Sequence, residues 1–412
     1  MTPSKLRITI LGLNYAPEPT GISPYTTRLA EKLVEEGHEI TVITGFPHYP
    51  EWKLTEGYTG WRRVEFINGV RVKRVRHFIP SRLNNMHRLH MELSFGVRLL
   101  FTRWRNPDVL LVVSPALFST AFVLARARFG FKRPATGIWV QDIYSRGLEE
   151  TGNGGSRAAK VMKITEGAIL RSATQVAVIH DRFKAYICRD LGVDPSKVNV
   201  IRNWTHVQPV VAVDRSATRA RHGWNEDDIV VLHAGNIGVK QALENVVNAA
   251  RLADATGSKV HFVLLGDGNQ RRHIETLSSD VNRIQFISPL PDKEFREALA
   301  SADILLVNEM AGLREMAVPS KLTSYFSTGL PVLAATEPDS TTAGEIEYSL
   351  GGIQIAPDSA ELLLTSAEKL AANPTLATKL GTAGQNYAGN VLSQHAAILQ
   401  YSEWLRELAV PK

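Results

Sequence analysis

Strand-like and helix-like segments alternate along this chain in two separate series, and this alternation restricts the fold more than any other feature. The first series has apolar, β-branched segments at residues 6–13, 40–44, 70–74, 109–113, 136–140, 175–179 and 198–201. The second has them at residues 229–235, 261–266, 284–288, 303–308, 331–336 and 352–356. Strands that alternate with helices form parallel sheets with helices on both faces. We therefore predict an α/β fold with two doubly wound halves.

The break between the two series gives the domain boundary. Residues 202–228 interrupt the alternation with Asn203, Trp204, Pro209 and a charged run. A chain of 412 residues also exceeds the roughly 250–300 residues that one hydrophobic core usually serves. We predict a first domain at 1–205, a second at 206–390, and a C-terminal helix at 391–412 that reaches back to the first domain.

Composition excludes several classes of protein. With 44% hydrophobic and 21% charged residues, the chain is not a disordered one. Cys188 is the only cysteine, which excludes an internal disulfide and a cysteine-ligated zinc, and the N-terminus lacks a signal-peptide pattern. A cytoplasmic location is expected. The uncharged stretch 109–125 is interrupted at Ser114-Pro115, so we predict a buried strand and a buried helix there and not a membrane span.

Three glycine-bearing loops follow predicted strands. In an open parallel sheet, ligands bind beyond the carboxyl ends of the strands, where loops lead into helix N-termini. The first loop runs from Asn14 to Ile22 and contains Gly21, the second is Gly235–Lys240, and the third contains Gly266. Each is a candidate phosphate site, and each taken alone is also compatible with an ordinary turn.

The second loop has the strongest case for binding a diphosphate. Gly235 and Gly238 permit unusual turn geometry, and Lys240 is a cation at the start of a helix expected at 240–253. Asn236 lies between them. Neither the dinucleotide GxGxxG pattern nor the P-loop pattern is present, and a tight strand-to-helix turn is the competing interpretation.

Two further predicted helix N-termini, one after the first loop and one at Pro319-Ser320, add to the case for phosphate binding. After the first loop, Ser23 is expected to cap a helix over 24–36, with Pro24 in its first turn and Gly37 at its end. Further on, Pro319-Ser320 begins a short helix whose first turn carries Lys321. Lys321 would add a second cation to a phosphate site; the alternative is an exposed lysine with no ligand.

Several of these motifs together resemble a known family. They are the loop from Gly12 to Ile22, the segments 36–44, 49–52 and 69–72, and the segment 318–334 with its Pro-Ser-Lys start. In this order they resemble the family-4 retaining glycosyltransferases, in particular the WcaI-type branch of colanic acid and exopolysaccharide biosynthesis. The resemblance covers nearly the whole chain and is most specific in the first loop and around 319–334.

The resemblance implies a GT-B fold, in which two Rossmann-like domains face each other across a cleft. It places a nucleotide-sugar donor mainly on the second domain and the acceptor on the first. It places the donor's diphosphate near Gly21, Asn236, Lys240 and Lys321. Together with Gly235, Gly266, Glu315 and Ser324, these are the residues that we predict to bind the donor. It implies no cofactor and no metal, because side-chain cations and helix dipoles stabilise the leaving diphosphate.

The chain departs from the family pattern at two points. The family commonly has two glutamates eight positions apart; here the second position is Ser324, and Met316 with Glu315 beside it stands at the first. A histidine that often follows the strand at 136–140 is replaced by Gln141-Asp142. Asp142 is therefore the catalytic candidate, with a turn-capping aspartate as the alternative. His180 and His233 either line the cleft or are core residues.

Positive charge is concentrated in one segment. Residues 62–105 contain eleven Arg and Lys against Glu65 and Glu92, interleaved with apolar side chains. This pattern favours contact with an anionic membrane surface, and a solvated basic helix is the alternative. No nucleic-acid recognition motif is present.

These observations predict a retaining, metal-independent glycosyl transfer from a nucleotide sugar to a glycan or polyprenyl-linked acceptor. The enzyme is expected in surface-polysaccharide assembly, in the cytoplasm or peripherally on the inner face of the cell membrane. Two other functions stay open at this point: a nucleotide-sugar 2-epimerase of the same fold, and a catalytically silent subunit that binds sugar nucleotides.

Overall fold

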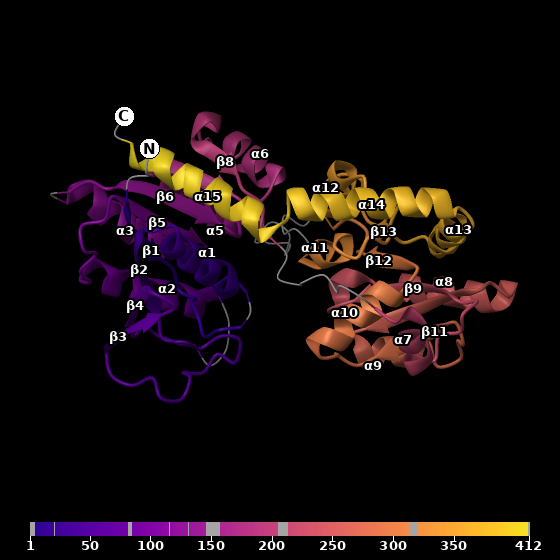
Figure 1. The fold of residues 1–412 in the computed structure, drawn as a ribbon. Helices are drawn as coiled ribbons and strands as arrows, with labels where there is room; N and C mark the ends of the chain where they lie inside the picture. The colour runs from indigo at the N-terminus through magenta and orange to yellow at the C-terminus, as the bar shows by residue number, and fades with distance from the viewer. Residues whose placement is uncertain are drawn as a thin grey trace. The chain divides into compact units, whose positions relative to one another are not determined.

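The chain forms two compact units in a computed structural model that describes residues 5–19, 21–80, 85–114, 116–130, 132–145, 157–204, 213–313 and 320–410. The first unit comprises residues 1–203 and 397–412, and the second comprises 204–396 (Figure 1). The predicted boundary at residues 205 and 206 lies outside the described residues. Each unit is an α/β layer structure with its own sheet.

The first unit contains a sheet with the strand order β3-β4-β2-β1-β5-β6-β7-β8. Neighbouring strands are parallel except for the edge pair β3 and β4. The strands are β1 (Arg7–Leu11), β2 (Glu39–Gly45), β3 (Arg62–Ile67), β4 (Val70–Val75), β5 (Val109–Ser114), β6 (Ala135–Val140), β7 (Gln175–Val178) and β8 (Val198–Val200).

The antiparallel strand β3 corrects the expectation of a wholly parallel sheet. β3 and β4 are joined by Asn68 and Gly69, which both have positive φ, at 48° and 80°. Two residues of this conformation form the tight turn that suits a two-residue hairpin. Since β3 is an exposed edge strand, its residues lack the apolar run that identified the inner strands.

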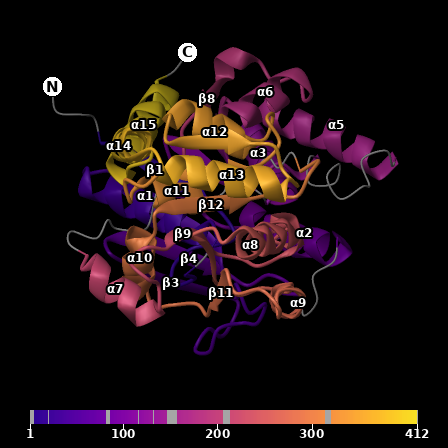
Figure 2. The same cartoon turned by 90° about the vertical axis from the view of Figure 1, so that its right-hand side faces the viewer.

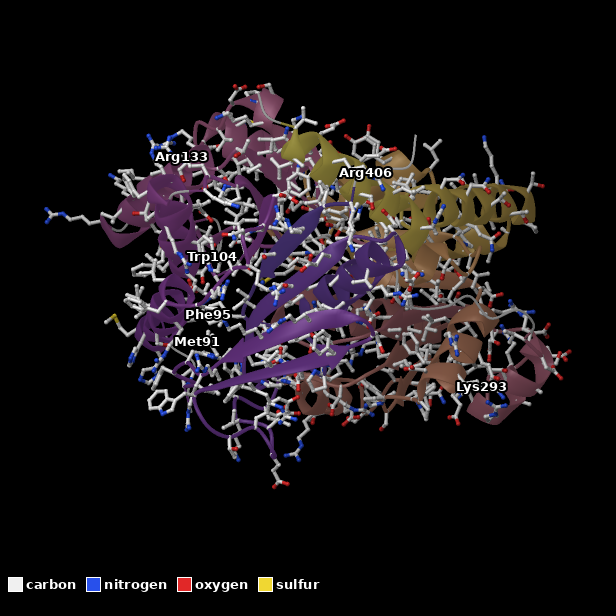
Figure 3. The ribbon with its side chains drawn as sticks, turned by 60° about the vertical axis from the view of Figure 1, so that its left-hand side comes forward. Met91, Phe95, Trp104, Arg133, Lys293 and Arg406 are labelled. Atoms are coloured by element: carbon white, nitrogen blue, oxygen red, sulfur yellow. The ribbon has the colours of Figure 1, made fainter. Side chains whose placement is uncertain are left out.

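Helices cover both faces of this sheet. They are α1 (Ser23–Glu35), α2 (Asn85–Leu100), α3 (Leu117–Phe129), α5 (Arg157–Ser172), α6 (Asp181–Arg189) and, from the chain's end, α15 (Gln394–Ala409). α2 packs against α3, and α3 packs against α5. Figure 3 shows Met91, Phe95 and Trp104 on the side where α2 packs. Phe95 and Trp104 belong to one core cluster with Val112 of β5.

The last helix, α15, covers the opposite face of the first sheet. Trp404 and Leu408 lie so close to Gly137 of β6 that a Cβ there would be 2.8 Å from the Trp404 ring. Gly137 pairs with Leu111 of β5, whose neighbour Val112 points to the α2 side. Arg406 forms an ion pair with Glu36 at 3.0 Å (Figure 3).

The second unit is built on a wholly parallel sheet with the order β11-β10-β9-β12-β13-β14 (Figure 2). Its strands are β9 (Ile229–Ala234), β10 (Val260–Leu265), β11 (Ile284–Ile287), β12 (Ile304–Asn308), β13 (Val332–Ala335) and β14 (Gly352–Ile355). Its helices are α7 (Arg215–His222), α8 (Glu244–Thr256), α9 (Arg271–Leu277), α10 (Asp292–Ser301), α11 (Ser320–Phe326), α12 (Thr341–Ser349), α13 (Ala360–Ala371) and α14 (Pro374–Asn390).

Two apolar clusters, one on each face of this sheet, explain why the second unit is doubly wound. Leu264 and Leu306 pack with α8 and α13, while their neighbours Val263 and Leu305 pack with α10 and α11. Both faces of each central strand are therefore buried, as expected for parallel strands. Within the described ranges, none of the helices has the length and apolar character that a membrane crossing requires. The stretch 109–125 forms β5 and most of α3, as predicted.

Candidate functional site

The centre of the second unit is the point where its strand order reverses. β9 leads to β10 and β11 on one side, and its neighbour β12 leads to β13 and β14 on the other. Loops that leave such a pair in opposite directions open a crevice at the carboxyl ends of the strands. β9 and β12 pair only at Val231–Ile304 and Leu232–Leu305. Their carboxyl ends are therefore not joined by the ladder.

A buried tyrosine joins the two strands beyond the last ladder pair. The hydroxyl of Tyr325 accepts a hydrogen bond from the Ala234 N–H at 2.7 Å and lies 3.2 Å from the Ala234 carbonyl and 3.4 Å from that of Leu306. Burial raises the pKa of Tyr325, so the hydroxyl keeps its proton. Tyr325 thus fixes the position at which the Gly235 loop leaves β9.

The two glycine loops of this unit pack backbone against backbone. Gly235 and Gly266 have φ values of 131° and 145°, and a Cβ on Gly266 would lie 1.9 Å from the Gly235 carbonyl oxygen. The Ile237 N–H donates to the Asp267 carbonyl at 2.9 Å. The structure therefore brings the predicted donor residues Gly235, Asn236 and Gly266 together. The Gly235 backbone excludes a side chain at Gly266, and the positive φ of Gly235 favours glycine there.

Lys240 lies on a 3-10 turn, and the helix predicted to begin there starts later. Val239–Gln241 forms the turn, Ala242 is left-handed with φ 43°, and α8 begins at Glu244. Asn308 holds this bend, because its side chain donates to the carbonyls of Gln241 and Ala242. Lys240 is exposed on this turn.

Lys321 is the cation that the structure places directly against the Gly235 loop. Its Nζ is 3.4 Å from Nε2 of His233, and a Cβ on Gly235 would lie 3.9 Å from the same Nζ. Burial lowers the pKa of Lys321 to about 8, against the opposing attraction of the Glu309 carboxylate. His233 is fully buried, and burial together with Lys321 holds its pKa well below the usual value. The neutral imidazole can therefore accept a hydrogen bond from the ammonium.

Glu309 is a functional candidate that the sequence did not reveal. It follows β12 directly, is only 8% exposed, and accepts hydrogen bonds from the hydroxyls of Thr336 and Thr342. These threonines fix the carboxylate, and its charge supports the protonated state of Lys321. The only sequence signal for Glu309 is that it directly follows a strand beside the reversal point. Many surface residues also follow strands, so this position does not identify a functional glutamate.

Ser324, at the second of the family's glutamate positions, and Glu315, beside the first, have different outcomes. Ser324 is buried on α11, one turn after Lys321, which is compatible with its assignment to the donor site and does not test it. Glu315 lies outside the described residues. Both assignments stay predictions.

In the first unit, Gly21 precedes α1 with a φ of 69°, and the predicted cap of this helix is wrong. The helix begins at Ser23 itself, because Ile22 is already helical and its carbonyl accepts from the Thr26 N–H. The Ser23 hydroxyl is therefore inside the first turn, buried and without a hydrogen-bond partner among the residues that the structure describes. The predicted end is confirmed, since Gly37 is left-handed with φ 91°.

Asp142 is exposed in the turn after β6, and its Oδ1 accepts a hydrogen bond from the Ile143 N–H at 2.9 Å. This contact agrees with the alternative interpretation, in which Asp142 caps the turn. A catalytic role for Asp142 stays a prediction. The neighbouring Gln141 exchanges two hydrogen bonds with the amide of Asn203. Nδ1 of His180 accepts from the Arg182 N–H and so caps α6. His180 is therefore explained by the fold.

The parts of the chain that the structure describes contain no cluster of metal ligands. There, no group of three or more His, Cys, Asp or Glu side chains is arranged to hold an ion. A metal-independent mechanism stays a prediction.

Comparison with known families agrees with this architecture. The Glycosyl transferase 4-like domain matches residues 20–204, and the domain of Glycosyl transferases group 1 matches residues 214–387. The chain belongs to the family-4 glycosyltransferases. This confirms the family expected from the motifs and the glycosyltransferase function.

Relatives of this glycosyltransferase are similar over nearly its whole length. The putative colanic acid biosynthesis glycosyl transferase WcaI of Escherichia coli K12 is 29% identical over 97% of this chain and 100% of its own. Sucrose-phosphate synthase from Thermosynechococcus elongatus has a TM-score of 0.69 at 18% identity, covering 98% of this chain and 99% of its own. Anabaena HepE in complex with UDP has a TM-score of 0.70 at 15% identity, with 98% and 100% covered. The predicted GT-B fold is confirmed.

The contact between the two glycine loops gives a stability prediction. We expect Gly266→Ala to lower the free energy of unfolding by about 2–4 kcal/mol, because the new Cβ displaces the Gly235 carbonyl. The matched control is Gly257→Ala, also at positive φ but with open space around it, for which we expect about 1–2 kcal/mol. Urea unfolding measures both. Equal losses would show that backbone conformation, and not the loop contact, is the constraint.

The lowered pKa of Lys321 gives a pH prediction. The ammonium is charged below about pH 8 and loses its proton as the pH rises, so affinity for a nucleoside diphosphate should fall above that pH, by up to about tenfold per unit. Lys321→Arg keeps the charge and should remove this fall, while Lys321→Ala should weaken binding at every pH. Titration calorimetry with UDP at several pH values measures it. An unchanged affinity across pH 7–10 in the unmodified protein would contradict the assignment.

Proposed function

We propose that this glycosyltransferase transfers a sugar from a nucleotide-sugar donor to a glycan or polyprenyl-linked acceptor during surface-polysaccharide assembly. The pathway is supported by the relative WcaI, whose name places it in colanic acid biosynthesis. The donor class is supported by HepE, which has been crystallised with UDP and with UDP-glucose. The observation that carries the proposal is the Lys321 ammonium held against the Gly235 loop at the strand reversal.

The chemistry follows from the charge of the leaving group. A nucleoside diphosphate departs with negative charge on its terminal phosphate, and fixed cations and N–H groups lower the free energy of that state. Lys321, supported by His233 and Glu309, is such a cation, and the exposed Lys240 is a second within the same loop region. The transfer proceeds without a metal and with retention, with the leaving phosphate helping to deprotonate the acceptor. Asp142 is the side chain proposed to assist at the acceptor.

We also propose that the enzyme binds an anionic membrane surface through the first unit. The exposed residues of α2 form an apolar stripe of Met86, Leu93 and Val97, which Phe101 extends at 86% exposure. The adjoining helices carry Phe129 on α3 and Val161 and Ile164 on α5, each more than 60% exposed. Side chains of this size and exposure, gathered on three neighbouring helices, are typical of an interaction surface.

The charge on these three helices selects the partner. Along the described lengths of α2, α3 and α5 the only acidic residues are Glu92 and Glu166, and both are buried. The exposed ends and sides carry cations: Arg98, Arg128, Arg157, Lys160 and Arg171. An apolar groove of about 650 Å³ lies between α3 and α5, and Arg133, labelled in Figure 3, is among its lining residues. Exposed apolar and cationic side chains without exposed acids complement anionic lipid. The surface therefore includes α3 and α5 in addition to part of the 62–105 segment.

Donor binding is testable by thermal denaturation with a panel of nucleotides and nucleotide sugars. A donor that binds only the folded state should raise the Tm. At a donor concentration a hundred times its Kd, the free energy of unfolding should rise by about 2.7 kcal/mol. We expect Lys321→Ala to abolish the shift, with exposed Lys293→Ala on α10 as the control that keeps it. Incubating the donor without acceptor separates the competing functions. An epimerised donor would contradict transfer, and slow hydrolysis that Lys321→Ala removes would exclude a silent subunit.

Membrane binding is testable by sedimentation with vesicles. We expect binding to vesicles that contain phosphatidylglycerol but not to pure phosphatidylcholine, and weaker binding as salt rises above the low-salt buffer. Arg128→Glu with Arg157→Glu should reduce it about 30-fold or more, since each charge near the surface contributes about 1 kcal/mol and two are lost and reversed. Lys293→Glu in the second unit is the matched control and should bind normally. Equal binding to both vesicle types would contradict an electrostatic surface.

A further inference from the structure

A pocket lies in the first unit, at the reversal point of its own sheet. β1 leads to β2 and β4 on one side, and its neighbour β5 leads to β6, β7 and β8 on the other. A pocket of about 290 Å³ opens there, lined by the loops after β1, β2 and β5 and by α2. Ligand pockets usually range over about 300–1,000 Å³, so this one fits a single small ring.

One wall of the pocket is aromatic and rigid. The rings of Tyr49 and Trp52 meet edge to face, with centroids 5.6 Å apart. Trp52 has a φ of 54°, a conformation that a bulky residue adopts only when its surroundings impose it. The start of the loop that carries Trp52 is fixed by the buried carboxylate of Glu18, which accepts the N–H groups of His48 and Tyr49 at 2.9 and 3.0 Å and the side-chain amide of Asn14. The wall is therefore in place without a ligand.

The opposite wall is polar and comes from α2. Arg88 and Glu92 both line the pocket, one helical turn apart, with Nε and Oε1 at 3.6 Å. Glu92 is 1% exposed, and its other oxygen accepts the Phe118 N–H at 3.1 Å. Arg88 is held by Tyr144, whose hydroxyl accepts from Nε at 3.0 Å and whose ring lies under the guanidinium.

This pairing of walls selects one chemical class of ligand. A phosphate would meet the Glu92 carboxylate, which offsets the charge of Arg88, and a lipid chain would bury Glu92 and Arg88 without new partners. A pyranose ring has an apolar C–H face for the aromatic wall and hydroxyls that both donate and accept. The hydroxyls match a carboxylate acceptor beside a guanidinium donor.

We propose that this pocket binds one pyranose ring of a substrate, stacked on Trp52 and Tyr49 and hydrogen-bonded through its hydroxyls by Arg88 and Glu92. This assignment rests on the proposed glycosyl transfer and specifies how a sugar is recognised. The same ring chemistry occurs at the end of a glycan acceptor and in the sugar of the donor. The experiment below separates these two sources.

The carboxyl of Glu92 adds a pH signature. Burial raises its pKa to about 7, against the opposing effects of the Phe118 N–H and Arg88. Above that pH the group is a carboxylate, which accepts a hydroxyl more strongly than the neutral acid does. Binding of the sugar should therefore strengthen as the pH rises through about 7. Glu92→Gln keeps an oxygen for the Phe118 N–H but cannot ionise, so its binding should not depend on pH in this range.

The test measures saturation-transfer NMR of methyl α-glycosides of glucose, galactose, mannose and fucose with the full chain. At least one should bind, and Trp52→Asn should weaken it about fivefold or more, as expected for loss of a stacked aromatic. Asparagine tolerates a positive φ, so this variant removes the ring without adding backbone strain. Thermal melts check that both variants fold. The control is Trp61→Asn, at a 68% exposed residue outside the pocket, which should bind as the unmodified protein does.

A second arm adds a saturating nucleotide sugar found by the donor screen. Glycoside binding that persists assigns the pocket to the acceptor, and displacement assigns it to the sugar of the donor. The proposal would be overturned if none of the four glycosides binds. It would also be overturned if, above about pH 7, Trp52→Asn and Glu92→Gln bind the glycoside as strongly as the unmodified protein does. Failure of the donor screen with glycoside binding retained would instead overturn only the transferase proposal, so the two failures are distinguishable.

Discussion

The reversal of strand order within each parallel sheet is the constraint on which the rest of this structure depends. A parallel strand must be followed by a crossover, and where crossovers leave two neighbouring strands in opposite directions, nothing covers their carboxyl ends. In the second unit this occurs between β9 and β12, and in the first between β1 and β5. Tyr325 stabilises the open ends of β9 and β12 from within, and Glu18 ties together the loops that line the corresponding opening in the first unit.

Charge at the second-unit site is maintained by a balance of opposing effects. Burying an ammonium raises its free energy, which is why the pKa of Lys321 falls to about 8. Glu309 offsets part of that cost, and neutral His233 offers a hydrogen bond without adding positive charge. A lysine that avoided this desolvation cost would lie at the surface, where water screens its charge. Its electrostatic attraction for a diphosphate would then be weaker. The threonines that fix Glu309 therefore belong to the proposed anion site through Glu309.

The sequence predicted the inner strands and the glycine loops well, because both leave local signals. Apolar runs identify a buried strand, Gly266 stands where the Gly235 backbone forbids a Cβ, and Gly235 has a φ that favours glycine. It missed what depends on distant partners. β3 is an edge strand with exposed side chains, and the start of α8 is set by Asn308, which is far along the chain from Ala242. Glu309 has no local pattern at all, since Thr336 and Thr342 give it its role.

Burial shifts the pKa values of the key groups in the two candidate sites in opposite directions. Burial disfavours the charged form of each group, so it raises the pKa of Glu92 to about 7 and lowers that of Lys321 to about 8. Glu92 is ionised above its pKa, and Lys321 is protonated below its own. If sugar recognition needs the carboxylate and diphosphate binding needs the ammonium, both groups are in the required state only between these values. A narrow, bell-shaped pH profile would then follow from burial alone, with one limb from each unit. Glu92→Gln would remove the acid limb and Lys321→Arg the alkaline limb, each without affecting the other.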